Sequence, residues 1–441
     1  MKSITSKIIF IFLLIFKLSK NQQKNEYSDL GYEKLLEWGL NNSLNITNKI
    51  KFVKDKDVKQ YIAKNLIPEG EQIMDIPPEI MINVNRSLKL LNSKKFRKAY
   101  HDYIEEDKLN TEVLKDDYHV DQSFMSYILY IVDHKKKTYE KNKFYQFYHP
   151  IFYMFENDLE SLPFYYSSEQ MRFFLNTSFG SIFEIFNRYI NGEATIFEKK
   201  IFKKPVIFED YLRYRIFSIQ KSYDINGTIN IVPFIDFIKN SFKNANCEFK
   251  IEDKHIKIKA THNIFPGEEL IMKPITISNQ HRFIFFGETF DEILDKFQSY
   301  NIPIIIPHFI TDKTNAQDLS ILGAHGNGRF DLAEFDFYSN VLNLYKKAAR
   351  ILKEDDSDYG ALNLLLKYIT KIRNNFNYIS KDDIRKAFYK QRDIDNVQRI
   401  IEGEKKFLDK KIDILKMHMK NVKLRSEEKP DNSDVEDVND L

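Results

Sequence analysis

The stretch that decides the fold runs from Ile231 to Pro274 and reads IVPFIDFIKNSFKNANCEFKIEDKHIKIKATHNIFPGEELIMKP. It opens with an uninterrupted apolar segment, Ile231–Ile235, which predicts a buried strand. Two runs of alternating apolar residues follow, one over residues 249–251 and one over residues 256–260. The Glu252-Asp253-Lys254 turn between these runs predicts a β-hairpin.

The end of this stretch repeats a pattern from much earlier in the chain. Ala260-x-x-x-Ile264-x-x-Gly267-Glu268 has the same spacing as Ala63-x-x-x-Ile67-x-x-Gly70-Glu71. In both copies the glycine follows a proline or lies within two residues of one, which predicts a turn between two short strands. The chain therefore carries two matching strand–turn–strand units, with an Asn-rich loop before the second.

Two such units with this loop resemble the two halves of a SET domain, the fold of protein methyltransferases that use S-adenosylmethionine. From residue 29 to about residue 425 the order and spacing of motifs is similar to one subgroup of these proteins. That subgroup includes the RuBisCO large-subunit lysine methyltransferase and the actin-histidine methyltransferase. The resemblance implies an α+β protein, in which a SET-domain β-fold with a helical insert is followed by an all-α C-terminal domain.

The resemblance also implies domain boundaries within the 441 residues, a length that suits two or three domains. We expect a SET domain over residues 29–300 with the helical insert at about 87–207. A helical C-terminal domain over 310–425 resembles the substrate-binding domain of the RuBisCO methyltransferase. Apolar periodicity and capping residues predict helices over 29–40, 208–221, 278–287, 332–352, 361–372 and 395–423.

Residue types and spacing alone, without this resemblance, predict an aromatic core helix and two helix caps. Phe124, Tyr127 and Tyr130 recur at helical spacing, which is typical of a buried core helix rather than of a binding site. Ser167 and Ser380 stand where the next helices begin and predict N-caps.

The resemblance assigns cofactor binding to four residues: Lys59, Lys221, Lys239 and Asn240. The subgroup has Gly-Arg-Gly-Leu in the place of residues 58–61, so that both glycines are replaced here. Glycine lets the backbone approach a ligand closely and adopt conformations that a side chain resists. Lys221 takes the place of an Arg that faces the cofactor carboxylate; a solvated helix end explains Lys221 equally well.

The family's catalytic motifs fall on residues of other types. Its Asn-His pair falls on Lys239-Asn240, or, after a slip of one residue, on Asn240-Ser241, which lets Asn246-Cys247 match a later Asn-Cys pair. Its Tyr-Gly pair, whose hydroxyl orients the methyl group and the attacking nitrogen, falls on Pro274-Ile275. Because proline has no hydroxyl, we assign no catalytic residue.

Three functions remain open on these grounds. The first is a SET-fold pseudoenzyme that binds a protein or peptide and needs no cofactor. The second is an active but divergent protein-lysine or protein-histidine N-methyltransferase that uses S-adenosylmethionine. The third is a purely helical scaffold in which the SET pattern is accidental. The residues leave open whether the chain is an enzyme.

The composition of the chain limits the classes of molecule that it is expected to bind. The formal net charge is only +3, which argues against nucleic acid or an anionic membrane as the main partner and leaves a protein or peptide. The lone Cys247 excludes an intramolecular disulfide and is expected in the core. The ten histidines are scattered and predict no metal site. The number of chains in an assembly cannot be read from the sequence.

The two ends predict a cellular route. Residues 1–22 pair two lysines with the apolar run Ile8–Phe16, as a secretory signal peptide does, and the run is too short for a stable membrane span. Sequons at Asn41, Asn45, Asn85, Asn176 and Asn226 would then meet the glycosylation machinery. Residues 426–441 form an acidic tail, expected to be disordered, whose ending loosely resembles an endoplasmic-reticulum retention signal. We expect the secretory pathway, with the lumen of the endoplasmic reticulum as one destination and the cytoplasm as the alternative.

Overall fold

The computed structural model of the chain describes thirteen ranges of residues, which together cover most of the expected SET domain and the last helices. They are 31–55, 58–110, 117–155, 162–174, 177–241, 243–273, 279–289, 303–305, 329–331, 342–343, 345–346, 349–350 and 355–427. The chain divides into two compact units. The first contains residues 1–160 and 187–277, and the second contains residues 161–186 and 278–441.

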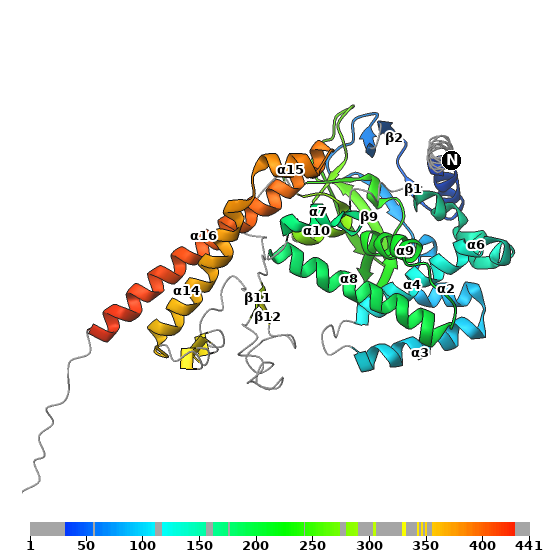
Figure 1. Cartoon of the computed structure of the whole chain (residues 1–441). Helices are drawn as coiled ribbons and strands as arrows, with labels where there is room; N and C mark the ends of the chain where they lie inside the picture. The colour runs from blue at the N-terminus through cyan, green and yellow to red at the C-terminus, as the bar shows by residue number, and fades with distance from the viewer. Residues whose placement is uncertain are drawn as a thin grey trace, which may run out of the picture. The chain divides into compact units, whose positions relative to one another are not determined.

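The first unit is built on a six-stranded sheet with the strand order β1-β4-β9-β8-β10-β7 (Figure 1). Strands β1, β4, β9 and β8 are antiparallel neighbours, whereas β10 runs parallel to both β8 and β7. The strands span Asn45–Ile46 (β1), Gln72–Ile76 (β4), Lys239–Asn240 (β7), Cys247–Glu252 (β8), His255–Ala260 (β9) and Ile271–Met272 (β10). Two hairpins stand beside it: β2 Ile50–Asp55 with β3 Val58–Ala63, and β5 Ser222–Ile225 with β6 Thr228–Ile231.

The hairpin of β8 and β9 confirms the prediction made from the alternating runs. Glu252 pairs with His255, so the turn consists of two residues, Asp253 and Lys254, with φ angles of 52° and 68°. Two consecutive residues with positive φ give the turn geometry that matches the twist of paired strands. Along β9 every second side chain is buried, as the alternation requires.

The strand predicted over Ile231–Ile235 is wrong beyond its first residue. Strand β6 ends at Ile231, and a short 3-10 helix, η7, spans Ile235–Phe237. Pro233 has no N–H to offer a neighbouring strand, and Phe234 has a φ of 76°, which no strand residue adopts. All five residues are nevertheless buried, so the apolar run indicated burial and not strand conformation.

The two repeated motifs lie against each other with nearly two-fold symmetric hydrogen bonds. The Gly70 N–H donates to the Ala260 carbonyl at 2.9 Å, and the Gly267 N–H donates to the Ala63 carbonyl at 2.8 Å. Ile67 and Ile264 exchange both of their backbone hydrogen bonds at 3.0 and 2.9 Å. Gly70 and Gly267 have φ angles of 79° and 91°, where a side chain would be strained. The repeat is therefore one interlocked structure rather than two separate turns.

Helices complete the first unit. The aromatic stripe predicted as core lies on α4, where Phe124, Tyr127 and Tyr130 are all buried, and the predicted N-terminal helix spans residues 31–41. The helical elements include Pro78–Ile80 (η1), Val84–Leu91 (α2), Lys94–Asn110 (α3), Asp117–His134 (α4), Lys136–Tyr139 (α5), Lys143–Tyr148 (α6), His149–Phe155 (η2), the π-helix Phe197–Ile201 (η6) and Phe208–Lys221 (α9). Helix α8, Ser178–Ile196, begins in the second unit and ends in the first.

The described part of the second unit is largely helical. Ser167 caps α7 through a capping box with Gln170, and Ser380 caps α15, as predicted. Its elements include Pro163–Tyr165 (η4), Ser168–Met171 (α7), Arg172–Phe174 (η5), Asn279–Phe286 (α10), Asp358–Asn375 (α14), Phe376–Tyr378 (η8), Lys381–Ala387 (α15) and Gln391–Glu427 (α16), with strands Pro303–Ile305 (β11) and Arg329–Asp331 (β12). Three predicted helices, over 278–287, 361–372 and 395–423, correspond to α10, α14 and α16. Most of the helix predicted over 332–352 lies outside the described residues.

Candidate functional site

The structure places the four predicted cofactor-binding residues in the first unit. Lys59 lies on β3, Lys221 is the last residue of α9, and Lys239 and Asn240 form β7. Pro274, where the family's tyrosine falls, lies outside the described residues. The predicted site is thus distributed over three elements, of which β3 is far from α9 and β7 in sequence.

One short segment, residues 269–272, joins two of these elements. The Leu270 N–H donates to the Tyr61 carbonyl of β3 at 3.0 Å, and the Lys239 N–H donates to the Leu270 carbonyl at 3.1 Å. Met272 of β10 lies opposite Asn240 of β7. The segment that resembles the glycine loop and the segment that resembles the Asn-His pair are therefore separated by a single backbone segment.

A carboxylate in that segment links the two flanking segments through side chains. Gln60 donates from Nε2 to Glu269 Oε1 at 3.0 Å, and Lys239 Nζ lies 2.8 Å from Glu269 Oε2. We call this three-residue contact the Glu269 bridge. The hydrogen bond from Lys239 is the main reason why the pKa of Glu269 is lowered; partial burial opposes it and Gln60 adds to it. Gln60 and Lys239, which the resemblance sets against a glycine and an asparagine of the family, are thus engaged with one acid.

Asn246 fixes the backbone around this bridge. Its Nδ2 donates to the Glu269 carbonyl and its Oδ1 accepts from the Ile271 N–H, both at 2.8 Å. The next residue, Cys247, is buried, and burial raises the pKa of its thiol to about 12. The Asn246-Cys247 pair therefore holds strand β10 in place, and Cys247 has the core position that its sequence context predicted.

Lys221 is held by an acid of its own. Its Nζ lies 2.6 Å from Asp236 Oδ2, and the two side chains are only 13% and 18% exposed. The other oxygen, Asp236 Oδ1, is buried and accepts no hydrogen bond within the described part of the chain. Such an oxygen loses its hydration without full compensation. Lys221 is consequently a partly buried partner of Asp236 and not a solvated helix end.

An aromatic cluster packs beside this ion pair. Tyr32 and Phe52 are stacked with ring centroids 3.8 Å apart, and Phe237 meets Tyr61 edge-on at 5.7 Å. The Tyr32 hydroxyl donates to the Tyr61 hydroxyl at 3.3 Å, and burial raises the pKa of Tyr61 well above its usual value. Four rings from four separate segments meet here, which no local pattern in the sequence could indicate.

The structure therefore shows two acidic contact residues of the predicted site, Glu269 and Asp236, that the sequence did not single out. Glu269 was visible only as part of a turn, and Asp236 only as a polar residue after an apolar run. A charge that interrupts a buried stretch is a usable signal, because such a charge needs a partner. Its partner Lys221 is not identifiable from spacing.

A comparison with protein-family models gives a match to the model described as "SET domain" over residues 61–273. This range contains both copies of the repeat and two residues of the Glu269 bridge, Lys239 and Glu269; the third, Gln60, lies one residue before it. The chain contains a SET domain.

Solved structures agree with this fold across nearly the whole chain. A structure described as "Structure of Rubisco LSMT bound to AdoMet" has a TM-score of 0.59 at 14% identity, with 89% of this chain and 92% of that chain covered. A second, "Crystal structure of the SET domain of LSMT bound to Lysine and AdoHcy", has the same TM-score and identity and covers 89% and 91%. The α+β SET architecture with a helical C-terminal region is thereby confirmed. Curated proteins give no sequence match.

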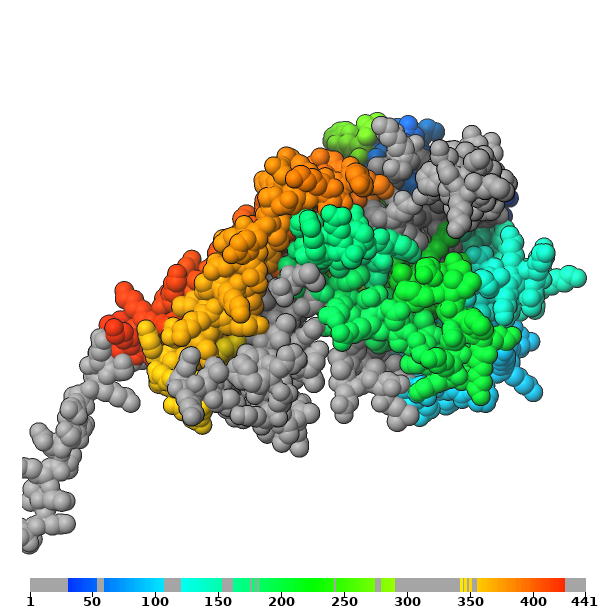
Figure 2. All heavy atoms as spheres, viewed as in Figure 1, coloured from blue at the N-terminus to red at the C-terminus, as the bar shows by residue number. Residues whose placement is uncertain are grey.

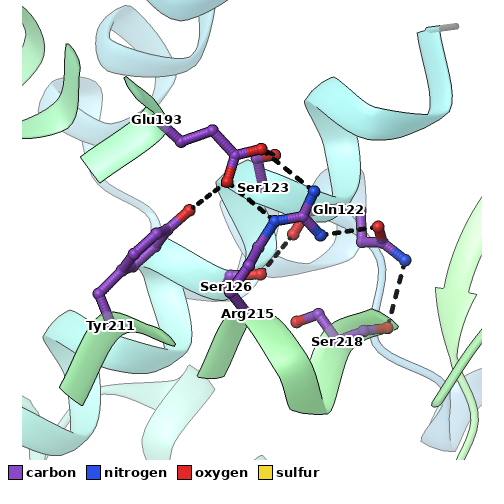
Figure 3. Close-up of polar contacts among 7 residues, drawn as sticks. All are labelled: Gln122, Ser123, Ser126, Glu193, Tyr211, Arg215 and Ser218. Atoms are coloured by element: carbon purple, nitrogen blue, oxygen red, sulfur yellow. Dashed lines mark hydrogen bonds and ion pairs between the residues drawn. The ribbon is translucent and has the colours of Figure 1, made fainter. Parts of the chain in front are cut away.

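A buried polar network anchors α9, the helix of the SET unit that ends at Lys221 (Figure 3). Arg215 of α9 forms two hydrogen bonds with Glu193 of α8, at 2.9 and 3.1 Å, and a third with Gln122 of α4 at 2.7 Å. Glu193 also accepts from Ser123 and, at 2.9 Å, from Tyr211. Each charge is therefore paired and hydrogen-bonded, as a buried charge must be.

The electrostatics of the network keep Arg215 ionised. Burial by itself lowers the pKa of a guanidinium, but the adjacent Glu193 carboxylate outweighs it, so that the pKa of Arg215 is raised. Arg215 and Glu193 are 1% and 2% exposed. The network fixes the direction of α9 and with it the place of Lys221.

The described residues contain no group of three or more His, Cys, Asp or Glu side chains that could hold a metal ion. None of the described helices combines the length and apolar character needed to cross a membrane.

Proposed function

We propose that this chain uses its SET domain as a protein- or peptide-binding module and no longer transfers methyl groups from S-adenosylmethionine. The observation that carries this proposal is the Glu269 bridge. It joins Gln60, at the position of a family glycine, to Lys239, at the position of the family asparagine. The two segments that grip the cofactor in the family are here tied to each other.

The charges of the candidate residues support the same conclusion. A cofactor carboxylate needs a cation that is available to it. Lys221 is paired with Asp236 at 2.6 Å, and Lys239 is paired with Glu269 at 2.8 Å. Two of the three lysines assigned to the cofactor therefore already neutralise an acid, and the residues present do not fit the cofactor well. We derive no methyl-transfer step for this chain.

The choice of a protein or peptide as the partner rests on the fold. The chain resembles Rubisco LSMT in its SET domain and in its helical C-terminal region, at TM-scores near 0.6. One of these structures is described as bound to methyl-lysine and AdoHcy. A scaffold shaped for a side chain of a protein retains that shape when catalytic groups are replaced, because fold and chemistry depend on different residues.

Calorimetry and thermal shift with S-adenosylmethionine and its demethylated product test the loss of cofactor binding. We expect no heat of binding and no shift for the full chain. A ligand at about 100 times its Kd would add about 2.7 kcal/mol to stability, which both methods detect easily. Clear stabilisation of the unmodified chain by either compound would overturn the proposal.

A restored variant makes a negative result informative. The substitutions Gln60→Gly, Lys239→Asn and Asn240→His return three of the family residues and remove the side chains that hold the Glu269 bridge. We expect this variant to bind the demethylated product of S-adenosylmethionine measurably in calorimetry and thermal shift, because the Glu269 bridge no longer ties the two segments together. The matched control is Lys250→Asn, which removes an exposed lysine that pairs with Glu248 on β8. The control is expected to behave as the unmodified chain.

The second candidate is an active, divergent protein-lysine or protein-histidine N-methyltransferase. It is favoured by structural neighbours that are described as bound to AdoMet or AdoHcy and by the position of Asn240 on β7, beside the Glu269 bridge. It predicts methylation of peptides or of the chain itself with labelled S-adenosylmethionine. The signal would disappear on Asn240→Ala; Lys221→Arg, which keeps the charge opposite Asp236, would retain it.

A further inference from the structure

The second half of α16 has an outer face that combines lysines with exposed apolar side chains. Lys416, Lys420 and Lys423 are all exposed. Beside them Met417 and Leu424 are 55% and 45% exposed, so two large apolar side chains face solvent on this part of the helix. Lysine and an apolar residue stand side by side at 416–417 and again, seven residues later, at 423–424, so the two pairs lie on the same face.

The opposite face of this half-helix is already used. Leu408, Leu415 and Met419 are buried, and α16 packs along α14, where Arg373 forms an ion pair with Asp409 at 2.7 Å. Figure 2 shows the last turns of α16, drawn in red, at the molecular surface beside α14. Core packing therefore does not explain the apolar residues on the outer face.

The sequence that follows α16 has the complementary pattern. Residues 428–441, which lie outside the described part, contain six acidic residues and one lysine. Their last nine residues, Ser433-Asp-Val-Glu-Asp-Val-Asn-Asp-Leu441, place an acid directly before Val435, Val438 and Leu441. Acid–apolar pairs recur here every three residues, and lysine–apolar pairs recur on the helix after seven residues.

We propose that residues 433–441 bind back along the outer face of α16. Their acidic side chains pair with Lys416, Lys420 and Lys423, and their valines and leucine cover Met417 and Leu424. The face is thus an interaction surface for an acidic segment with interleaved apolar residues, and its occupant is the tail of the same chain. The proposal is independent of whether the SET domain binds a cofactor.

The required chain reversal is within reach. Lys429-Pro430-Asp431-Asn432 carries proline followed by Asp and Asn, which are residues typical of turns. The distance from residue 423 to residue 416 along a helix is about 10 Å, because each residue rises about 1.5 Å. A 14-residue segment can span about 45 Å when extended. The short connection keeps the local concentration of the tail in the millimolar range.

The lysines alone would accept any acidic ligand. The lysines together with Met417 and Leu424 favour a ligand that carries both acidic and apolar side chains. Asp413 is exposed on the same part of the helix, so the face is not uniformly basic. A polyphosphate backbone would use the lysines and leave Met417 and Leu424 uncovered, whereas the tail pairs with both kinds of side chain. We therefore assign the face to the tail and make nucleic acid an outcome of the test.

A synthetic peptide of residues 428–441 tests the proposal in trans. One protein is the full chain; the other is the full chain with a neutralised tail, D434N/E436Q/D437N/D440N. We expect the peptide to bind the neutralised variant at least about ten-fold more tightly than the unmodified chain, because only the latter supplies its own competitor. Raising the salt from 50 to 300 mM is expected to weaken binding several-fold, since exposed charges are screened.

Two further variants place the contact on this face. In the neutralised background, Lys416→Glu/Lys420→Glu/Lys423→Glu is expected to abolish peptide binding. Lys89→Glu/Lys94→Glu/Lys141→Glu, an equal charge change at exposed lysines of the first unit, is expected to leave it intact. The proposal would be contradicted if the peptide bound the unmodified chain and the neutralised variant with equal affinity. It would also be contradicted if the peptide still bound after the triple substitution on α16. A single-stranded oligonucleotide that binds the unmodified chain more tightly than the peptide binds the neutralised one would contradict it as well.

Discussion

At the scale of single residues, the site is distinguished by the partners of its charges. Lys221 and Lys239 each face a carboxylate at hydrogen-bond distance, and Gln60 shares the second of these carboxylates. An isolated exposed ion pair contributes little to stability. The Lys239 and Glu269 side chains are themselves 54% and 35% exposed, and what distinguishes the Glu269 bridge is that its three residues come from three backbone segments that are hydrogen-bonded side by side.

The pH dependence of stability tests whether the Glu269 bridge stabilises the folded chain. The pKa of Glu269 is lowered in the folded chain, chiefly by Lys239. Its stabilising effect is therefore fully present above the ordinary pKa of a glutamate, about 4.3, and is lost as the pH falls through the folded value. We expect Glu269→Gln to lower the melting temperature at pH 7, and we expect this difference from the unmodified chain to shrink as the pH falls through the lowered pKa of Glu269. Identical melting temperatures at pH 7 would show that the bridge contributes nothing.

At the scale of elements, the repeated motif and the buried network do different things. The motif interlocks two strand–turn–strand units through paired backbone hydrogen bonds, with glycines where φ must be positive. The network of Arg215 and Glu193 connects α4, α8 and α9 through side chains that are almost fully buried (Figure 3). The two matching units could be predicted from spacing, because each depends on a local turn, whereas their interlocking joins residues far apart in sequence, such as Gly70 and Ala260. The network could not be predicted from spacing, since its members lie up to 93 residues apart.

Breaking the network on one side is expected to be costly. Glu193→Ala leaves the guanidinium of Arg215 buried without its counter-charge, which typically costs about 3–5 kcal/mol. Urea unfolding followed by circular dichroism measures this loss. The double variant Glu193→Leu/Arg215→Met removes both charges and is expected to lose much less than Glu193→Ala, because no buried charge is left alone.

The exposed pair of Glu248 and Lys250 on β8 provides the control. Glu248→Ala is expected to leave the free energy of unfolding nearly unchanged, because solvent screens such a pair. If Glu193→Ala were no more destabilising than Glu248→Ala, the network would not anchor α9.

At the scale of the whole molecule, the SET architecture covers nearly the entire chain, although identity to the similar structures is only 14%. A fold can be shared at so low an identity because apolar spacing, turn residues and helix caps each satisfy a local physical requirement that many sequences meet. The cellular route is not a property of the fold. For it we propose that residues 1–22 direct the chain into the secretory pathway.

N-linked glycosylation tests the secretory route, because only a chain that enters the secretory pathway meets the enzymes that attach glycans to sequons. Asn226 is exposed at the tip of the β5–β6 hairpin, in a two-residue turn with φ angles of 56° and 78° at Asn226 and Gly227. Expressed in full length in eukaryotic cells, the chain is expected to carry a glycan at this sequon, seen as a shift in gel mobility after amidase treatment. Asn226→Gln should remove one glycan. A full-length chain that amidase leaves unchanged at every sequon would contradict the secretory route.

The sequence by itself determined the frame of this protein. The equal spacing of Ala63, Ile67 and Gly70 with Ala260, Ile264 and Gly267 was sufficient to predict paired units, and the alternation along residues 256–260 predicted their hairpin. The same reasoning misjudged Ile231–Ile235, because an apolar run reports burial and does not specify backbone conformation. Pro233 and the positive φ of Phe234 decided against the strand.

Only the tertiary structure decided how the charges of the site are paired. Gln60 and Glu269 are 209 residues apart, and no periodicity connects them. Their contact exists because Leu270 pairs with the backbone of β3, which places the adjacent Glu269 between Gln60 and Lys239. Local patterns fix strands, turns and caps, since those depend on neighbours in sequence. The partners of Lys221 and Lys239 depend on neighbours in space, and these partners determine whether a lysine is available to a ligand.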